Sequence, residues 1–522
     1  MNLRQFPISD LRSGFYASLI ALPLSLGIAA ASGFPPITGI FAAIIGGIIC
    51  SAFGSSPLTI KGPAAGLIVI AISAVQELGM GDLTLGYHRA LAAGAAAGVL
   101  QVILALCGAG RLGSIMPPSV VHGMLAGIGV IICSKQIHVL LGVIPSSKTP
   151  LALISEVPNS IINEEPFIAL LGAITLLGLI IFPKLKYFKS FPAALLNLFI
   201  VVPLGFALHL GEPHQAHLLG HWYTLGPDYL VHIPTHALAS ITFPDWTALK
   251  TLLGWKFVIM FALVGSIESL LTVSAVDSLD PEKRTSNLDR DLLSVGIGNL
   301  MSSLIGGLPM ISEIVRSKAN IDNGAKTVFS NVFHGIFLLL AITTIPYIIN
   351  AIPLSSLAAM LVITGFRLAS PKEFIKVYKV GLDQFALFSV TMLVTLFSNL
   401  LSGVFIGILL EVIFHLIRGA KPINFINNDI ERSAFSNEHM ILIPKGPCVF
   451  SNLPKLQDII TLSLQSAQSI AIDFSKSKLV DHTTLNRLQS LKRMHPHHKF
   501  QLSGLDTMKG VSPHELATRF RS

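Results

Sequence analysis

The chain has 522 residues, of which 52% are hydrophobic and only 12% are charged. Ordinary soluble domains contain about 25% charged residues, so this composition excludes a soluble globular protein and predicts a chain that crosses a membrane many times. The formal net charge of +8 does not indicate a nucleic-acid-binding protein, because many basic residues lie in short loops between apolar segments.

Fourteen apolar segments follow one another along the chain. They lie at about residues 14–32, 36–53, 63–76, 86–107, 118–142, 166–183, 191–210, 256–275, 288–305, 310–320, 328–346, 355–367, 381–397 and 400–418. Alternate loops carry most of the basic residues, among them Lys61, Arg111, Lys184 and Lys372. By the positive-inside rule, this asymmetry predicts a multi-pass protein of the cell (inner) membrane with both termini in the cytoplasm and its apolar surface against lipid.

Two of the shortest segments, 63–76 and 310–320, occupy the third and tenth places. Both are too short for a straight helix that crosses a membrane core of ~30 Å. Both follow breaks rich in glycine and proline, Lys61-Gly62-Pro63-Ala64-Ala65-Gly66 and Gly306-Gly307-Leu308-Pro309-Met310. Matching interrupted segments in two halves of seven predict an inverted-repeat transporter with its binding site at the breaks.

The paired breaks predict an anion site. If the two half-helices begin near the middle of the membrane, their free N–H groups and positive dipole ends attract a negative solute. The first half-helix would contribute Ala64, Ala65 and Gly66, and the second would contribute Met310, Ile311 and Ser312. We expect Ser312 in the first helical turn, where its hydroxyl could also donate. The alternative is that these glycines and prolines only kink buried helices.

Glu268 is an ionisable residue inside the eighth apolar segment, where its charge costs about 3 kcal/mol and indicates a functional position. Thr272 lies one turn further along the same helix face, so its hydroxyl could share a cation with the carboxylate. We expect Glu268 to hold a coupling ion, H⁺ or Na⁺, and the alternative is a structural residue that is protonated or hydrogen-bonded. No other cofactor is expected.

Two further groups are secondary candidates. Glu313 and Arg316 have the spacing of a helical ion pair, and Arg316 could either raise the positive potential near the anion or join helix bundles. His214, His217 and His221 have the spacing of ligands on a helix, but no cysteine lies nearby, which makes zinc a minor alternative.

The composition changes after residue 420. We expect a transmembrane domain over residues 1–420, a linker over 421–437 and a cytoplasmic domain over 438–522. The last part alternates strand-like runs at 440–443 and 469–474 with helical runs at 454–466 and 483–494, which predicts a small α/β domain.

The chain resembles the SulP family of inorganic anion transporters over essentially its whole length. The resemblance rests on motifs that occur together and in this order: Leu22 to Ala29 leading into Gly33 to Ile40, Lys61 to Ala65, Glu268 to Thr272, Gly306 to Pro309, and Gly324 to Thr327. It implies a core and a gate domain in a 7+7 inverted repeat, an elevator-type movement and a homodimer. In the family the anion lies between the third and tenth half-helices.

The resemblance also bears on the coupling ion. In bicarbonate-carrying cyanobacterial members, an acidic residue and a threonine four positions later in the eighth segment hold Na⁺. Glu268 and Thr272 occupy these positions, with Glu in place of Asp, so both Na⁺ and H⁺ stay open. Many proton-coupled members carry a glutamate after the first-segment proline, and here that position is Leu24. Coupling would therefore rest on Glu268 and, secondarily, on Glu313.

The soluble region resembles a STAS domain. Related domains place an Asp-Ser-Ser turn, a phosphorylation site in some members, before a helix, and the best match here is Leu479 to Thr484. Asp481 is kept, but His482 replaces the first serine. The resemblance therefore implies docking or assembly of protomers rather than regulation by phosphorylation at this turn.

The sequence thus favours secondary active transport of bicarbonate or sulfate with Na⁺ or H⁺. One alternative is a chloride exchanger or a leak. A second is a membrane scaffold that presents the STAS domain to a partner such as a carbonic anhydrase. An intramembrane enzyme is not expected, because no Ser/His or paired-Asp constellation occurs within the apolar segments.

Overall fold

The computed structural model describes residues 7–521 except 148, 188–190, 219, 235, 437–438, 465–468 and 495–497. The predicted boundary between linker and cytoplasmic domain, at 437–438, therefore lies outside the described residues. The chain forms two compact units. The first comprises Met1–Ala109, Gly129–Asp280 and Thr285–Arg367, and the second comprises Gly110–Ile128, Pro281–Arg284 and Leu368–Ser522.

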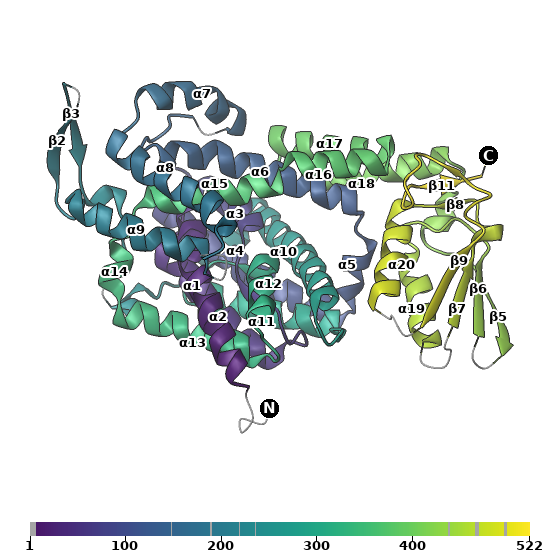
Figure 1. Ribbon diagram of the computed structural model, residues 1–522. Coiled ribbons are helices and arrows are strands. Elements are labelled where there is room, and N and C mark those ends of the chain that lie inside the picture. Colours follow the sequence, from purple (N-terminus) through teal and green to yellow (C-terminus); the bar gives the residue numbers. More distant parts are fainter. Residues whose placement is uncertain are drawn as a thin grey trace. The chain divides into compact units, whose positions relative to one another are not determined.

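The first unit is a helical bundle (Figure 1). Its helices are α1 (Ile8–Ala31), α2 (Pro36–Phe53), α3 (Ile68–Gly79), α4 (Leu83–Leu106), α7 (Pro150–Ile162), α8 (Pro166–Ile181), α9 (Ala193–Ala207), α10 (Leu252–Leu279), α11 (Leu288–Leu304), α12 (Ile314–Asp322), α13 (Phe329–Thr344), α14 (Pro346–Asn350) and α15 (Leu354–Leu368). Helix α6 (Pro118–Leu140) begins in the second unit and ends in the first.

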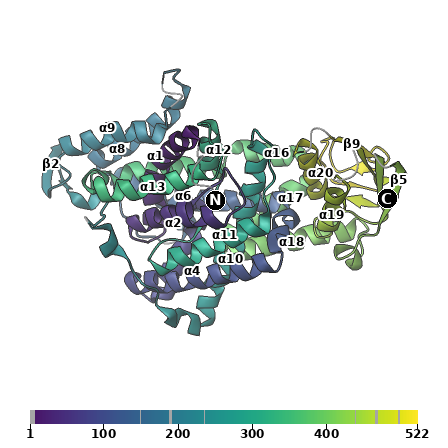
Figure 2. The same cartoon turned by 90° about the horizontal axis from the view of Figure 1, so that it is seen from below.

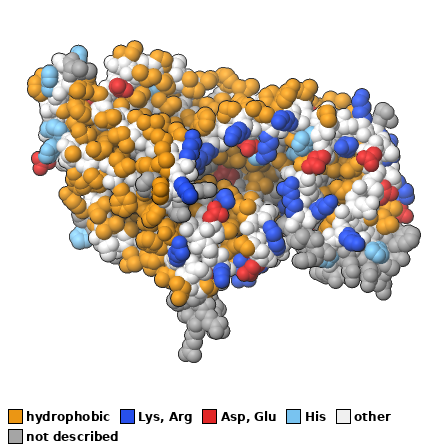
Figure 3. All heavy atoms as spheres, in the orientation of Figure 1, with side chains coloured by type: hydrophobic (Ala, Val, Ile, Leu, Met, Phe, Trp, Pro, Cys, Tyr) orange, Lys and Arg blue, Asp and Glu red, His pale blue; other side chains and the backbone are white. Residues whose placement is uncertain are grey.

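The predicted helical fold is confirmed. Within the described residues, eight helical segments are long and apolar enough to cross a membrane, and four shorter apolar helices accompany them. Helices α11 and α12 account for the two remaining predicted segments, at 288–305 and 310–320. In Figure 3, hydrophobic side chains cover much of the visible surface over α8, α9 and α14, as expected for helices that face lipid.

Helices α4, α10 and α11 run side by side (Figure 2). Asp82 begins α4 by accepting hydrogen bonds from the N–H groups of Thr84 and Leu85 at 2.8 and 3.1 Å. Small residues then let α4 and α11 approach closely, because a Cβ atom on Gly98 would lie 2.5 Å from the backbone nitrogen of Leu300. This close contact fixes the polar residues of α4 and α11 relative to each other.

A short two-stranded ribbon lies inside this bundle. Strand β1 (Ile60–Pro63) pairs antiparallel with β4 (Met310–Glu313), in a register that places Ile60 opposite Glu313 and Pro63 opposite Met310. The two strands come from the two interrupted segments of the sequence. The breaks therefore meet in space, as the inverted repeat predicts.

A hairpin lies at one edge of the first unit (Figure 1). Strands β2 (His214–Leu218) and β3 (His221–Leu225) form it, with His217 opposite Trp222 and Leu218 opposite His221. The interpretation of His214, His217 and His221 as ligands on one helix was therefore wrong, because the segment is extended. Within the described residues, these histidines do not form a group of converging metal ligands.

The second unit contains α5 (Leu112–Ile115), α16 (Pro371–Val380), α17 (Leu382–Phe397), α18 (Leu400–Ile417) and the C-terminal α/β domain. The domain has strands β5 (Ile430–Ser436), β6 (His439–Pro444), β7 (Ser469–Asp473), β8 (Leu479–Val480), β9 (Lys499–Ser503), β10 (Lys509–Gly510) and β11 (Arg519–Phe520), with helices α19 (Leu453–Ser463) and α20 (His482–Met494).

The four-stranded sheet of this domain has the order β5-β6-β7-β9, with β6, β7 and β9 parallel. Helices α19 and α20 cover one face of the sheet (Figure 1). Buried leucines and isoleucines of both helices pack there against Ile470 and Ile472. The expected strands and helices are all present, and β5 lies within the stretch that we expected to be a linker.

Candidate functional site

The β1–β4 ribbon positions both half-helices. After β1, the 3₁₀ turn η1 (Ala65–Leu67) leads into α3, and directly after β4 the chain enters α12. Because the strands are antiparallel, the two half-helices leave from opposite ends of the ribbon. Three residue steps along a strand separate these ends by ~10 Å. The N-termini of the two half-helices therefore lie at opposite ends of the ribbon, and each carries the positive end of a helix dipole.

The structure places the six predicted anion-site residues in strand β4 and in the turn that follows strand β1. Ala64 and Gly66 are buried at the beginning of η1, with Ala65 between them. Met310, Ile311 and Ser312 are buried, but they belong to strand β4 and not to a helix. The expectation that Ser312 lies in the first helical turn was wrong, because α12 begins only at Ile314 and extended pairing with β1 takes the preceding residues.

Neither half-helix has a side chain that caps its N-terminus. Ala64 precedes η1 and Glu313 precedes α12, and neither side chain accepts a hydrogen bond from the turn that follows. Val315, in the first turn of α12, is 51% exposed. An uncapped N-terminus leaves N–H groups that need an acceptor, and an anion supplies one.

Helix α10 contacts both breaks through consecutive residues. The Glu268 carboxylate lies against Gly66, because a Cβ atom added there would stand 2.1 Å from Oε1 and 2.3 Å from Oε2. The hydroxyl oxygen of Ser269 accepts a hydrogen bond from the N–H of Ser312 at 3.3 Å. Glu268 is 7% exposed, and its Oε1 has no hydrogen-bond partner among the described residues. The Glu268 carboxylate therefore lies against the beginning of the first half-helix, and the next residue of α10 contacts the second break.

Thr272 lies one helical turn beyond Glu268 on α10, as expected, and is partly buried. Within the described residues, no hydrogen bond joins its hydroxyl to the Glu268 carboxylate. The two side chains thus share a helix face without being linked to each other, and both keep oxygen atoms that a small cation could use.

Arg316 is fully buried in the first turn of α12, and its guanidinium reaches across to the other break. Its Nη2 donates to the carbonyl oxygen of Pro63 at 3.4 Å, while Nε and Nη1 have no partner among the described residues. The ion pair that the spacing of Glu313 and Arg316 allows does not form in the described part of the chain. The guanidinium is therefore held next to both half-helices with no salt bridge within 4 Å among the described residues.

Sequence reasoning missed Asn299 of α11. Its side-chain amide donates to the carbonyl of Met310 at 3.1 Å and accepts from the N–H of Met310 at 2.6 Å. The same amide donates to the Gln101 side chain of α4 at 2.7 Å. Polar side chains inside apolar segments are the signal that could have revealed this pair. Their role is to hold the start of β4 against the α4–α11 contact.

The position of Lys61 corrects a second expectation. We expected Lys61 in a cytoplasmic loop, but it lies in the middle of β1, and its Nζ pairs with Asp291 of α11 at 3.0 Å. The two side chains are only 2% and 1% exposed. Asp291 also accepts from the Ser312 hydroxyl at 3.4 Å, so one carboxylate joins both strands of the ribbon to α11.

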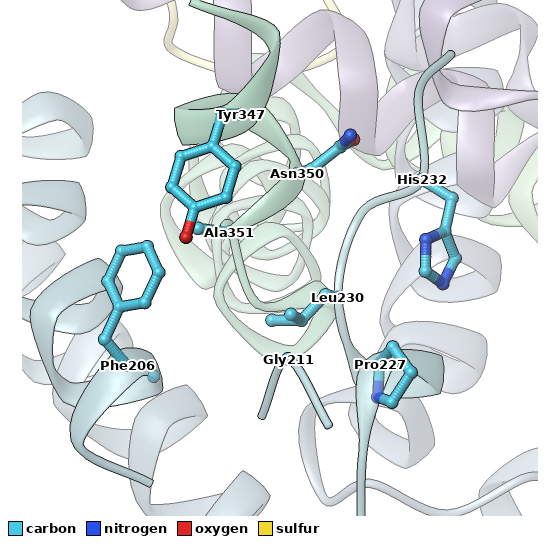
Figure 4. Close-up of a pocket in the computed structure, with 9 residues that line it drawn as sticks. Phe206, Gly211, Pro227, Leu230, His232, Tyr347, Asn350 and Ala351 are labelled. Atoms are coloured by element: carbon cyan, nitrogen blue, oxygen red, sulfur yellow. The ribbon is translucent and has the colours of Figure 1, made fainter. Parts of the chain in front are cut away.

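A cavity of about 280 Å³ lies elsewhere in the first unit. Figure 4 shows Phe206 of α9 and Tyr347 of α14 along one side of it and His232 on the other. The rings of Phe206 and Tyr347 stack with centroids 6.0 Å apart. None of the predicted site residues lines this cavity.

Comparisons with known proteins all point to anion transporters. The sulfate permease family profile matches residues 8–392. The putative sulfate transporter YvdB of Bacillus subtilis is 28% identical over 462 residues, which cover 87% of this chain and 83% of YvdB. The bicarbonate transporter BicA of Synechocystis is 28% identical over 407 residues, which cover 77% of this chain and 69% of BicA.

Solved structures share the fold. The transmembrane domain of a cyanobacterial BicA superposes with a TM-score of 0.65 at 24% identity, covering 77% of this chain and 98% of that domain. The overall structure of SLC26A9 gives a TM-score of 0.68 at 12% identity and covers 95% of this chain and 84% of that one, and the C-terminal α/β domain fits a STAS domain. The chain therefore belongs to the sulfate permease (SulP) family and is a multi-pass anion transporter of the membrane.

Proposed function

We propose that the protein is a secondary active transporter of bicarbonate or sulfate that couples the anion to Na⁺ or H⁺ at Glu268. The observation that carries this proposal is the contact of α10 with both breaks, through Glu268 at Gly66 and Ser269 at Ser312. A cation held by Glu268 lies where it can offset the charge of an anion between the half-helices.

The anion binds through the N–H groups of the two helix beginnings. Ala64, Ala65 and Gly66 present one set, and the first turn of α12 presents the other. Ser312 holds the site in place and is not its main donor to the anion. Its N–H already donates to Ser269, and its hydroxyl already donates to Asp291. Met310 and Ile311 continue the same supporting strand, and Arg316 adds positive potential. Relatives named for sulfate and for bicarbonate favour an oxyanion as the substrate.

The coupling ion is H⁺ or Na⁺. The buried, unpartnered Oε1 of Glu268 needs either a proton or a cation, since an isolated carboxylate is costly in an apolar environment. If Na⁺ is the ion, Glu268 and Thr272 hold it with oxygen ligands on one helix face. Glu313, at the end of β4, is a secondary acidic group on the same ribbon.

The remaining parts follow the family arrangement. The transport domain covers residues 1–420 and carries the anion by an elevator-type movement. Residues 421–437 join it to the STAS-like domain of residues 438–522. We infer a homodimer in the cell (inner) membrane with both termini in the cytoplasm, in keeping with the distribution of basic loops.

Counterflow in proteoliposomes tests the substrate. Labelled bicarbonate and labelled sulfate are offered separately, while Na⁺ and pH are varied independently. We expect uptake of one oxyanion that depends on Na⁺ or on pH. Uptake of neither anion under any gradient would overturn the proposal, and cation-independent exchange with chloride would make the protein an exchanger.

A truncation separates transport from scaffolding. A chain that ends at Gly419 lacks the STAS-like domain but keeps both half-helices and Glu268. We expect this chain to bind the transported anion, measured by the protection that the anion gives against thermal unfolding. Loss of anion binding in a folded truncated chain would favour the scaffold alternative.

A further inference from the structure

Three buried side chains of the second unit converge near the end of α18. Glu411 and His415 lie one helical turn apart on that helix, and Asp481 lies between β8 and α20 of the α/β domain. One ligand atom from each of the three lies within 4.8 Å of those from the other two. All three residues belong to the same compact unit.

These side chains are almost completely removed from solvent. Glu411 and His415 are each 1% exposed, and Asp481 is 0% exposed. The rings of Phe425 and Phe450 pack beside the His415 ring, with centroids 6.2 and 5.9 Å away. Water therefore has little access to the three polar groups.

Several polar atoms of these three side chains have no hydrogen-bond partner among the described residues. Both carboxylate oxygens of Glu411 and Nδ1 of His415 have no partner within the described residues. Asp481 accepts from the N–H groups of Phe450 and Thr484 at 2.6 and 2.8 Å, and its Oδ2 is 3.7 Å from Nε2 of His415. Glu411 is therefore the side chain for which the fold provides no partner.

The neighbouring cation does not supply the missing charge. Arg418 lies on the same helix end, but its guanidinium pairs with Asp383 at 2.8 Å. Glu411 and Asp481 therefore remain two buried acidic groups, with the His415 imidazole close to both. Asp481 already accepts two backbone N–H groups, but the Glu411 carboxylate has no partner among the described residues. An unpartnered buried carboxylate is strongly unfavourable, and a bound cation would satisfy it.

We propose that Glu411, His415 and Asp481 bind a divalent transition-metal ion, with Zn²⁺ as the best match. An imidazole nitrogen with carboxylate oxygens is a donor set that zinc accepts, whereas Ca²⁺ and Mg²⁺ prefer oxygen ligands alone. Ligand atoms around a tetrahedral zinc lie about 3.4 Å apart, so the three side chains close inward by roughly an ångström when the ion binds.

With three protein ligands, the fourth position of a tetrahedral zinc would be filled by an enclosed water molecule, and we assign the site a structural role. Its ligands come from the last membrane helix and from the turn that begins α20, so the ion fastens the α/β domain to α18. The rings of Phe425 and Phe450 pack beside His415, and all three ligands are almost fully buried. Because binding requires the two elements to be together, the ion stabilises their contact.

The full-length protein, purified in detergent with an affinity tag that contains no histidine and stripped with EDTA, is titrated with Zn²⁺ against a chromophoric chelator. We expect one Zn²⁺ per chain and a higher melting temperature in its presence. Co²⁺ in place of Zn²⁺ should give visible absorption bands. Glu411→Gln and Asp481→Asn should each weaken binding more than tenfold, since even indirect contacts to a metal are worth 10–100-fold.

Matched controls keep the test decisive. Glu431→Gln changes an exposed acid of the same domain and should leave binding unchanged. His415→Cys supplies a thiolate ligand and should keep one Zn²⁺ per chain even if other variants fold poorly. A variant with His214, His217 and His221 all changed to Asn removes the surface histidines of the β2–β3 hairpin. The proposal is overturned if the wild-type chain binds no Zn²⁺. It is also overturned if the hairpin variant loses Zn²⁺ binding while Glu411→Gln keeps it.

Discussion

The carboxylate of Glu268 occupies the space that a side chain at Gly66 would need. A Cβ atom on Gly66 would lie 2.1 Å from Oε1 of Glu268, well inside van der Waals contact. The absence of a side chain at position 66 thus allows the only acidic group of the middle of α10 to reach the beginning of the first half-helix. This relationship brings the proposed coupling residue, Glu268, against the proposed anion site.

Replacing Gly66 with alanine should separate the Glu268 carboxylate from the beginning of the first half-helix. The added methyl group forces the Glu268 carboxylate away from η1, and we expect the initial rate of cation-driven uptake to fall at least tenfold. Gly205→Ala is the matched control, because a Cβ atom there meets its nearest neighbour at 3.7 Å. Uptake by Gly66→Ala at the wild-type rate would show that the close contact has no role in coupling.

The buried ion pair of Lys61 and Asp291 should be needed for folding. Removing one partner leaves an uncompensated charge in the bundle, which costs about 3–5 kcal/mol. We therefore expect Lys61→Met and Asp291→Leu each to lower the melting temperature strongly. The double variant should be more stable than either single variant, because it leaves no buried charge. A double variant that is less stable than both would contradict this explanation.

Asn299 should stabilise the start of β4. Asn299→Leu keeps the side-chain volume but leaves the N–H and carbonyl of Met310 unpaired, at about 1–3 kcal/mol for each buried group. The melting temperature of the purified protein should fall by several degrees. Asn163→Leu, at the exposed end of α7, is the control and should change it little. Equal melting temperatures for the two variants would rule out the bridging role.

Arg316 should act through its charge. We expect Arg316→Gln to raise the KM for the anion about tenfold, which corresponds to ~1.4 kcal/mol, and Arg316→Lys to restore most of the affinity. The melting temperature should stay unchanged, because the guanidinium has one hydrogen bond to lose. If Arg316→Gln instead lowers the melting temperature and leaves KM unaltered, Arg316 serves to join helices and does not attract the anion.

Much of this arrangement could be predicted from local sequence. The apolar segments gave the helices, and the two breaks at Gly62-Pro63 and Gly306 to Pro309 indicated that the third and tenth segments meet. Glu268 stood out because a charge inside an apolar segment is costly. Each of these signals lies within a short stretch of chain.

The remaining features depend on contacts between distant residues. Strand β4 was expected to be helical because its partner, β1, lies about 250 positions earlier in the chain, and pairing of this kind leaves no local pattern. The same holds for Lys61 with Asp291 and for Gln101 with Asn299, which only the packing of α4 and α11 brings together. Sequence periodicity identifies buried positions but not the partners of buried polar groups.

The most direct measurement for the central claim is cation-driven uptake by Glu268→Gln in proteoliposomes, with Glu77→Gln as the control. Glu77 lies on α3, where its carboxylate forms a surface ion pair with Lys256 at 2.8 Å. We expect Glu268→Gln to abolish anion uptake driven by a Na⁺ or H⁺ gradient, while anion exchange at equilibrium continues and Glu77→Gln behaves as wild type. Gradient-driven uptake that is intact in Glu268→Gln would contradict the assignment of Glu268 as the coupling residue.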